Sequence, residues 1–343
     1  MDKKHAMALH DRESTVESDG SRLASAATRY DVAEAEALWN THYGRTATAS
    51  KIPSEVDAVF RMSEAESRAD YLFRIADNQD GIVDLQAAAL IHVAETAPEL
   101  PVSAVLPGRT GDTVIALPSL HGEQHAAFAT SFLPGKPLTT FAPPQAIRAR
   151  IFEKLALLDR ALENFCHPSA ERSLLWDVSR ADQVASLAGS IPDPELRGLA
   201  QNTLGDWRSQ AAPALPALRR QIIHNDFNPS NILANGNGEI TGIIDFGDVI
   251  EAPLICDLAT AIAYQEPEGG FDALLSAATD TYVQRCPLTD GEVAVLPILV
   301  RARAAMVITI AHWRAEQSPH NRAYLLRNVP LASRLLASAA QSL

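Results

Sequence analysis

Cysteine is scarce in this chain of 343 residues, which contains Cys166, Cys256 and Cys286 and no others. The three lie far apart, form no C-x-x-C pair and have no companion pair of histidines at zinc-binding spacing. This pattern excludes a scaffold held together by disulfides and a structural zinc site. We therefore expect reduced, mostly buried thiols.

Basic residues are also few. The sequence has 29 lysines and arginines against 42 aspartates and glutamates, which gives a formal net charge of -13. Binding to a phosphate backbone needs clustered basic side chains, so nucleic acid is not expected as a partner. The acidic balance suits a cationic or zwitterionic small molecule better.

Long uninterrupted apolar runs are missing as well. The most apolar late segment, 296–313, contains Arg301 and Arg303 and falls short of the ~20 clean apolar residues that a membrane span needs. Residues 1–10 carry lysines with no apolar run after them, so no signal peptide is expected. Residues 1–28 are polar and charged, which predicts a flexible leader. We expect a cytoplasmic protein without a membrane partner.

The chain does contain a globular proportion of 47% hydrophobic and 21% charged residues. Its length favours two lobes with a cleft between them. Residues 29–134 are expected to form an N-lobe, a small antiparallel sheet that carries a helix. The expected helices there are 31–43 and 83–94, and the expected strands lie within 51–75, 114–117 and 126–132.

Turn residues at 133–137 predict a hinge between the lobes. The remainder, 135–343, is predicted to be a mainly helical C-lobe with β structure at 221–249 only. Its expected helices are 147–165, 182–188, 195–211, 271–284, 292–314 and 322–339. The predicted fold class is therefore α+β with two lobes.

One segment of the C-lobe carries a pattern typical of chemistry on phosphates. It has the form H-x-D-x-x-x-x-N followed by D-F-G, with His224, Asp226, Asn231 and Asp245 at the named positions. Asn235-Gly236-Asn237-Gly238 lies between Asn231 and Asp245 and predicts a β-hairpin. Because a hairpin returns its two ends to the same place, Asn231 and Asp245 are expected to share a metal site. One carboxylate and one amide oxygen suit Mg²⁺.

Asp226 lies on a loop that Asn228 and Pro229 keep from becoming helical, so it can face an acceptor hydroxyl. In phosphoryl transfer the protein mainly positions groups and neutralises charge, and one carboxylate with two metal ligands is a nearly complete set. His224 is expected to brace the loop through backbone hydrogen bonds. Each residue alone is typical of an ordinary turn or core, but their ordered combination favours a phosphotransferase.

These residues resemble the aminoglycoside phosphotransferase and choline kinase superfamily, and within it the hydroxylysine kinase branch. The resemblance runs from about residue 31 to the end. Beyond the catalytic segment it rests on S-E-V-D-A-V-F at 54–60, D-L-Q at 84–86, W-D-V at 176–178, D-L-A at 257–259, L-V-R-A-R at 299–303 and P-H-N-R-A-Y-L at 319–325.

The resemblance implies a bilobal protein-kinase-like fold with the nucleotide bound by the N-lobe. It implies that Asp226 is the catalytic base, that Asn231 and Asp245 are the metal ligands, and that ATP or GTP is the phosphoryl donor. It places Ser54 in the nucleotide loop. It also places the nucleotide base near Thr130 and Phe132.

The sequence departs from the family pattern at the phosphate-binding position. Where the family usually has a lysine on the third strand, this chain has Arg74, and the usual glutamate partner on the following helix is Gln86. Arginine is a planar, permanent cation, so the exchange is not conservative. Gln86 can hydrogen-bond Arg74 but cannot neutralise it. Val59, where the branch tends to have Asn, is a smaller departure.

The acceptor is expected to be an amino alcohol or a hydroxylated amino acid, with hydroxylysine as the named candidate. Asp248 and Glu251 are candidate partners of its ammonium group. Asp257 is expected to cap the next helix or to brace the catalytic loop. Arg301 and Arg303 are candidates for a substrate carboxylate, although internal salt bridges are favoured.

Several alternatives remain open at this point. An aminoglycoside, homoserine, choline or ethanolamine kinase has the same motifs. A nucleotide-binding pseudokinase with a regulatory role is the alternative from another class, motivated by Arg74 and Gln86. A protein kinase is disfavoured because no A-P-E segment follows Gly247.

Overall fold

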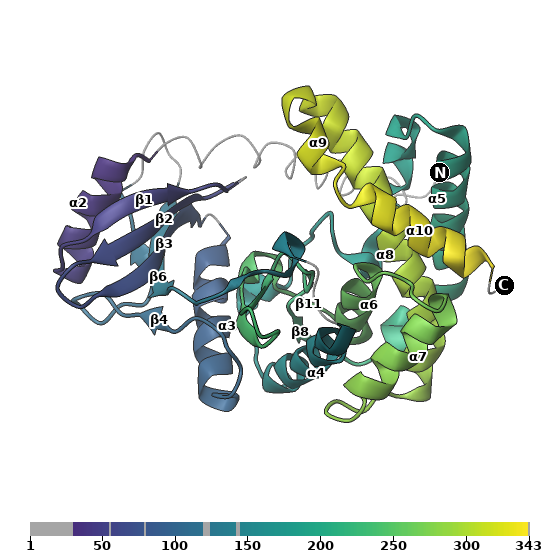
Figure 1. Ribbon diagram of the computed structural model, residues 1–343, viewed down its shortest axis with the longest axis horizontal. Coiled ribbons are helices and arrows are strands. Elements are labelled where there is room, and N and C mark those ends of the chain that lie inside the picture. Colours follow the sequence, from purple (N-terminus) through teal and green to yellow (C-terminus); the bar gives the residue numbers. More distant parts are fainter. Residues whose placement is uncertain (1–29, 55, 79, 119–123, 142–144, 342–343) are drawn as a thin grey trace.

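The computed structural model describes residues 30–341, except 55, 79, 119–123 and 142–144. The expected leader at 1–28 lies outside the described residues. The described chain has an N-lobe built on an antiparallel sheet and a mainly helical C-lobe (Figure 1). The predicted bilobal α+β fold is confirmed.

The N-lobe contains most of the elements that the sequence predicts. Its helices and strands are α2 (Val32–Tyr43), β1 (Thr48–Ile52), β2 (Ala58–Glu64), β3 (Ala69–Asp77), α3 (Ile82–Thr96), β4 (Val105–Leu106), β5 (Ile115–Ala116) and β6 (His125–Ser131). The strand order is β1-β2-β3-β6-β4, with β5 also paired to β6, and every pairing is antiparallel. Strand β4 was not predicted, because a two-residue strand is too short to show alternation.

Side chains along β3 point alternately to the two faces of the sheet. Phe73 and Ile75 are fully buried against α2, and the Trp39 ring centroid lies 5.7 Å from that of Phe73. Successive side chains of a strand point to opposite faces, so Leu72 and Arg74 point the other way, toward the C-lobe. Because α2 covers one face, the sheet presents Arg74 at the other.

The C-lobe is mainly helical, with short strands near the N-lobe. Its elements are β7 (Lys136–Pro137), α4 (Gln145–Ala161), a 3₁₀ helix (Val178–Ser190), α5 (Pro194–Asp206), β8 (Arg220–Ile223), β9 (Ile232–Ala234), β10 (Ile240–Ile243), β11 (Ile250–Pro253), α6 (Ile255–Ala263), α7 (Phe271–Tyr282), α8 (Asp290–Gln317), α9 (Arg322–Leu325) and α10 (Val329–Ala340). Strands β9 and β10 form the predicted hairpin, and β8 pairs with β11.

Two of the sequence predictions for the C-lobe were wrong in detail. The segment 182–188 is helical as predicted and belongs to a 3₁₀ helix, but β structure is not confined to 221–249, because β7 precedes that range and β11 continues to Pro253. The single helix predicted at 322–339 is two helices. Pro330 lies in the first turn of α10, and proline suits a helix start because it has no N–H to donate.

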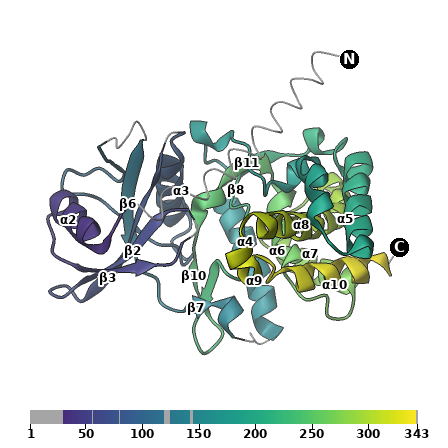
Figure 2. The same ribbon diagram turned by 90° about the horizontal axis from the view of Figure 1, so that it is seen from above.

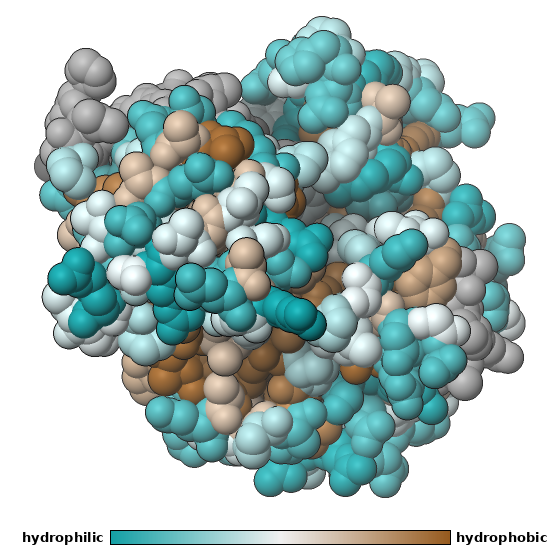
Figure 3. Space-filling model, turned by 60° about the vertical axis from the view of Figure 1, so that its left-hand side comes forward, coloured by the Kyte–Doolittle hydropathy of each residue, from teal (hydrophilic) through white to brown (hydrophobic). Residues whose placement is uncertain are grey.

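Helix α8 forms the centre of the C-lobe. By length and composition alone it is long and apolar enough to cross a membrane, but 78% of its most apolar window is buried inside the protein. Figure 2 shows it among α5, α6, α7 and α10. Burial of this kind is typical of the core helix of a large lobe. On the face of the molecule seen in Figure 3, hydrophilic residues predominate and hydrophobic ones gather in separate patches.

The chain crosses from β6 to the C-lobe through the segment predicted as a hinge. Strand β7 pairs with β9, and the Thr241 hydroxyl donates to the Pro134 carbonyl at 2.6 Å. Gly135 between them has a φ of 114°, in the region that favours glycine. A Cβ added to Gly135 would lie 2.3 Å from Thr241 Oγ1 and 3.0 Å from the Ala234 carbonyl oxygen.

Gly135→Ala should therefore destabilise the fold. The strained backbone and the close backbone contact together predict a loss of about 1–3 kcal/mol in the free energy of unfolding. Urea denaturation measures it. Gly236→Ala in the β9–β10 turn is the control, because an added Cβ there has no heavy atom within 4 Å. Equal stability of the two variants would show that the linker does not need glycine.

Candidate active site

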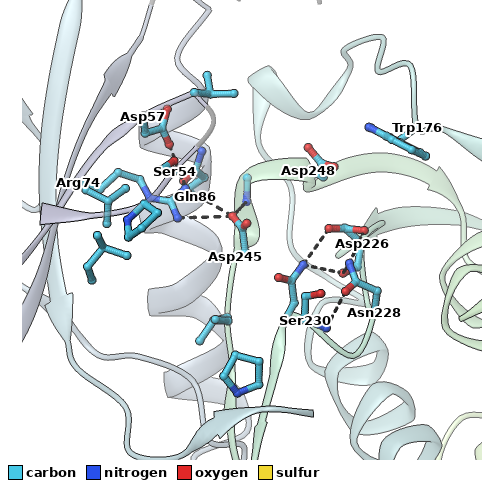
Figure 4. Close-up of a pocket in the computed structure, with 18 of the residues that line it drawn as sticks. Ser54, Asp57, Arg74, Gln86, Trp176, Asp226, Asn228, Ser230, Asp245 and Asp248 are labelled. Atoms are coloured by element: carbon cyan, nitrogen blue, oxygen red, sulfur yellow. Dashed lines mark hydrogen bonds and ion pairs between the residues drawn. The ribbon is translucent and has the colours of Figure 1, made fainter. Parts of the chain in front are cut away.

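A cavity of about 830 Å³ lies between the two lobes (Figure 4). The N-lobe contributes β3, α3 and the segment that follows β1, and the C-lobe contributes the catalytic segment and parts of α8 and α9. The predicted site residues that line it are Ser54, Arg74, Gln86, Phe132, Asp226, Asn231, Asp245 and Asp248. Residues far apart in the sequence thus meet in one place.

The catalytic loop, which begins after β8 at His224, is held in place by a side chain of the C-lobe core. The Asp257 carboxylate accepts hydrogen bonds from the backbone N–H groups of His224 at 2.8 Å and Asn225 at 2.9 Å. Asn225 has a left-handed φ of 65°, so the chain turns sharply just before Asp226. Asp257 lies inside the first turn of α6 and does not cap it. The bracing role is confirmed, and the capping role is not.

His224 is fully buried and braces the loop, as the sequence indicated. Its ring Nε2 lies 3.1 Å from the Ile244 carbonyl oxygen, and its Nδ1 accepts from the Asp226 N–H at 3.3 Å. His224 therefore acts as a positioning residue, because its ring holds the catalytic loop against β10 and does not line the cavity.

Asp226 is held at both carboxylate oxygens. Oδ1 accepts from Asn228 Nδ2 at 2.8 Å and lies 3.4 Å from Arg303 Nη2, and Oδ2 accepts from Asn231 Nδ2 at 2.8 Å. Burial raises the pKa of Asp226 to about 7, helped by the negative charge of Asp248 and opposed by the Arg303 cation. A carboxylate with a pKa near neutrality is suited to general-base catalysis.

Arg303 is a buried partner of Asp226 that the sequence alone did not reveal. Its guanidinium lies 5.1 Å from the Trp176 ring centroid and 5.8 Å from that of Tyr264, and it donates to the Trp176 carbonyl. The favoured internal salt bridges are confirmed for both late arginines, since Arg303 pairs with Asp226 and Arg301 Nη1 lies 3.4 Å from Asp206 Oδ2.

Asn231 and Asp245 lie at the ends of the β9–β10 hairpin. The Ile244 N–H donates to the Asn231 carbonyl at 2.9 Å, so the two ends are adjacent, as predicted. The Asn231 amide nitrogen also donates to the Asp226 carbonyl at 3.0 Å, which leaves its amide oxygen for another partner. The Asp245 side chain is 48% exposed to the cavity. This pair of oxygen donors fits Mg²⁺, and their role as metal ligands stays a prediction.

Arg74 is bound by three side chains at once. Nη1 donates to Asp57 Oδ2 at 3.2 Å and to Gln86 Oε1 at 3.3 Å, and Nη2 lies 3.4 Å from Asp245 Oδ1 (Figure 4). Gln86 is the neutral partner that the sequence indicated. The neutralising carboxylate comes from Asp57, which sequence reasoning left without a role although it lies in the 54–60 motif. Burial raises the pKa of Asp57, and the Arg74 cation opposes this.

The cavity also has an apolar slot that sequence reasoning missed. Its upper wall has Val59 and Leu72 from the N-lobe, and its lower wall has Leu233 and Ile244 from the C-lobe hairpin. Such a slot suits the flat face of a purine base. The Phe132 ring at its edge lies 4.7 Å from the Arg61 guanidinium carbon.

Besides His224, two predicted site residues do not line the cavity. Thr130 is only 4% exposed and pairs with Val105 of the neighbouring strand β4, and Ser131 and Phe132 line the cavity instead. Glu251 lies on β11, and its carboxylate is 3.5 Å from Arg220 Nε. The strand β11 was unforeseen, and its pairing with β8 turns Glu251 toward Arg220.

Comparison with protein families identifies the chain. Residues 48–288 match the model of a family described as "Phosphotransferase enzyme family", abbreviated APH. The chain belongs to this phosphotransferase family. It is therefore a kinase that acts on small molecules, and the match includes β1, the catalytic loop and both predicted metal ligands.

Among curated proteins, this phosphotransferase resembles hydroxylysine kinases. It is 23% identical to the hydroxylysine kinase of Mus musculus over 342 residues, covering 88% of this chain and 87% of that protein. It is 24% identical to the one from Danio rerio over 306 residues, covering 83% and 84%. The sequence resemblance to the hydroxylysine kinase branch is thus confirmed.

Solved structures support the same fold. A microcompartment-associated aminopropanol kinase has a TM-score of 0.68 and 17% identity, covering 91% of this chain and 97% of that one. An amicoumacin kinase has a TM-score of 0.65 and 14% identity, covering 88% and 93%. At these identities the likeness shows that the phosphotransferase shares their fold.

The ionisation of Asp226 should set the acid side of the pH profile. Because the pKa of Asp226 is about 7, the carboxylate is lost as pH falls, and kcat/KM should drop tenfold per pH unit below about pH 7. Asp248→Asn removes a negative charge that raises this pKa, so its falling limb should move to lower pH. Initial rates of both proteins across the pH range measure the shift. An unchanged inflection would mean that Asp226 does not set it.

Arg74→Ala should raise the nucleotide KM and lower kcat/KM at least tenfold, about 1.4 kcal/mol of transition-state stabilisation. Arg74→Lys should also lose activity, because one ammonium cannot replace a planar fork that contacts Asp57, Gln86 and Asp245 together. Arg45→Ala, an exposed N-lobe arginine that does not line the cavity, is the control for steady-state kinetics. Parental kinetics in Arg74→Ala would place phosphate binding elsewhere.

Proposed function

We propose that this phosphotransferase transfers the γ-phosphoryl group of ATP or GTP to a hydroxyl of an amino alcohol or hydroxylated amino acid. Hydroxylysine is the first candidate acceptor. The observation that carries the proposal is the meeting of Asp226, with a pKa of about 7, and the Arg74–Asp245 pair in one cavity. The resemblance to hydroxylysine kinases over 88% of the chain supports the choice of acceptor.

The residues that line this cavity suit both a nucleotide and a divalent metal ion. The apolar slot of Val59, Leu72, Leu233 and Ile244 would hold the base, and Arg74 would bind the phosphates. Asn231 and Asp245 would hold Mg²⁺, which neutralises charge on the phosphates when bound. The amicoumacin kinase of the same fold was solved with AMP-PNP and Ca²⁺, in agreement with a nucleotide and a divalent ion.

Asp226 would act on the acceptor. Its carboxylate takes the proton of the acceptor hydroxyl as the new oxygen–phosphorus bond forms and the bond to the nucleoside diphosphate breaks. Asn228, Asn231 and Arg303 keep the carboxylate in one orientation, so little reorganisation is needed when the hydroxyl arrives. His224 and Asp257 act one layer further out, because they hold the loop on which Asp226 lies.

The structure weakens the physical basis of the pseudokinase alternative. That alternative rests on Arg74 and Gln86, because a neutral glutamine cannot compensate the cation. Asp57 supplies the missing negative charge at 3.2 Å, so the cation is held in place as a lysine–glutamate pair would hold it. The family shown by the sequence is an enzyme family.

A panel of acceptors tests the proposal. Purified protein is given ATP or GTP with and without Mg²⁺, together with hydroxylysine, homoserine, choline, ethanolamine, 1-aminopropan-2-ol and an aminoglycoside. Phosphorylated product is identified by mass spectrometry. We expect Mg²⁺-dependent product from hydroxylysine. Product from none of the acceptors would refute the proposal, and product from a different one would replace the acceptor.

Asp226→Asn should lower kcat on the order of 10²-fold or more and leave nucleotide affinity nearly unchanged. The amide keeps the size of the side chain but cannot accept a proton. Steady-state rates and nucleotide titration measure the two effects separately. Asp206→Asn, on the outer helix α5, is a matched control away from the cavity. Near-parental turnover in Asp226→Asn would remove Asp226 from the mechanism.

A further inference from the structure

Two neighbouring carboxyl groups are fully buried in the core of the C-lobe. Asp159 lies on α4 and Asp257 in the first turn of α6, and each residue is 0% exposed. Helix α4 packs against α7 and α6 (Figure 2), and the two carboxyl groups are in hydrogen-bonding contact. A buried charge is costly unless hydrogen-bond donors surround it, so the donors around each group determine which of them is ionised.

Asp257 has a hydrogen-bond donor at each of its two oxygens. Oδ1 accepts from the Asn225 N–H at 2.9 Å, and Oδ2 accepts from the His224 N–H at 2.8 Å. Burial raises the pKa of Asp257, whereas the His224 ring and these N–H groups lower it. The surroundings of Asp257 therefore suit a negative charge.

Asp159 has fewer donors than Asp257. Its Oδ2 accepts from the hydroxyl of Tyr282 on α7. Its Oδ1 is buried, and no group among the residues that the structure describes donates to it. An ionised carboxylate would leave this oxygen without a donor, which is unfavourable in the core. A proton on Oδ1 removes that cost, because a protonated carboxyl group can donate to Asp257.

The other ionisable groups around Asp159 do not supply the missing donor. Burial raises the pKa of Asp159, the charge of Asp257 raises it further, and the Arg219 cation opposes them. Arg219 is bound to another carboxylate, however, since its Nε lies 2.7 Å from Glu292 Oε1. Cys286 is near as well, and burial raises the pKa of its thiol, so it adds no positive charge.

We propose that Asp159 is a positioning residue for phosphoryl transfer, which keeps a proton on Oδ1 and donates it in a hydrogen bond to the Asp257 carboxylate. That carboxylate holds the backbone of His224 and Asn225, and Asp226 is the next residue of the chain. Helix α4 thus takes part in placing Asp226 through two carboxyl groups in series. This inference rests on the proposed function, which gives Asp226 its role.

Infrared difference spectroscopy tests the proton directly. The spectrum of Asp159→Asn at neutral pH is subtracted from that of the parent protein, so the carboxyl groups common to both cancel. We expect the difference to contain the C=O band of a protonated carboxylic acid. A carboxylate band in its place would show that Asp159 is ionised and would overturn the proposal. The measurement needs no turnover, so its result stands even if the proposed acceptor is wrong.

The same variant tests the hydrogen bonds. Asp159→Asn should fold and keep kcat within about threefold of the parent value, because its amide has a carbonyl to accept from Tyr282 and an N–H to donate to Asp257. Urea denaturation measures the stability, and steady-state rates with the acceptor that the panel identifies measure kcat. Loss of the fold or of turnover would contradict the proposal, since an amide can replace a protonated carboxyl group but not an ionised one.

Removal of the donor tests the positioning role. Asp159→Leu keeps the bulk of the side chain but donates nothing, so it should lower kcat by about tenfold or more with little change in the nucleotide KM. Asp159→Ala, which adds no bulk, gives the same test if the leucine does not fit. Glu153→Gln, which removes a carboxylate from the same helix at its contact with Arg285, is the control and should keep the parental kcat. Parental kcat in Asp159→Leu, or equal effects on kcat and nucleotide KM, would show that Asp159 does not position Asp226.

Discussion

The carboxylate of Asp257 is the constraint on which the active site depends. It accepts two successive backbone N–H groups, from His224 and Asn225, and so fixes the loop that carries Asp226. Asp159 lies beside it in the core and accepts a hydrogen bond from the Tyr282 hydroxyl at 2.5 Å. Burial raises the pKa of Asp159 well above its ordinary value, and the charge of Asp257 raises it further.

Burial also raises the pKa of Asp257, and each of two neighbouring buried carboxyl groups makes ionisation of the other less favourable. The pKa of Asp159 is the more strongly raised, whereas the backbone N–H groups of His224 and Asn225 lower that of Asp257, which favours the charge on Asp257. The position of Asp226 in the cavity is thus secured from α4, α6 and α7 together. Precision at the reaction centre depends on this interior network, because Asp257 fixes the backbone from which the Asp226 side chain extends.

The sequence revealed the part of the site in which the residues are close together in the chain. His224, Asp226, Asn231 and Asp245 lie within one hairpin-containing segment, so the turn signal at 235–238 was enough to bring the last two together. Partners from distant elements were missed. Arg303 is 77 residues from Asp226, and no local periodicity links an α8 arginine to the catalytic loop.

In the N-lobe, too, one partner was predicted from the sequence and another was missed. The pairing of Arg74 with Gln86 could be inferred from the family resemblance, whereas Asp57 faces Arg74 through the irregular segment before β2. The incorrect positions of Thr130 and Glu251 also have a physical origin. Both positions depend on the strands β4 and β11, which are too short to show an alternation pattern in the sequence.

The net charge of the whole protein and the charges inside the cavity have different effects on the acceptor. A net charge of -13 describes the whole surface, and salt screens exposed charges beyond about 8–10 Å, so it has little influence inside a walled cavity. Within the cavity the nearest charged side chains determine the electrostatic potential, because a low-dielectric wall weakens screening between them. There Arg74 meets Asp57 and Asp245 at the nucleotide end, and Arg303 meets Asp226 at the centre. Arg74 and Arg303 are thus each matched by carboxylates of the protein, so an acceptor in the cavity meets a balance of charge that differs from that of the surface.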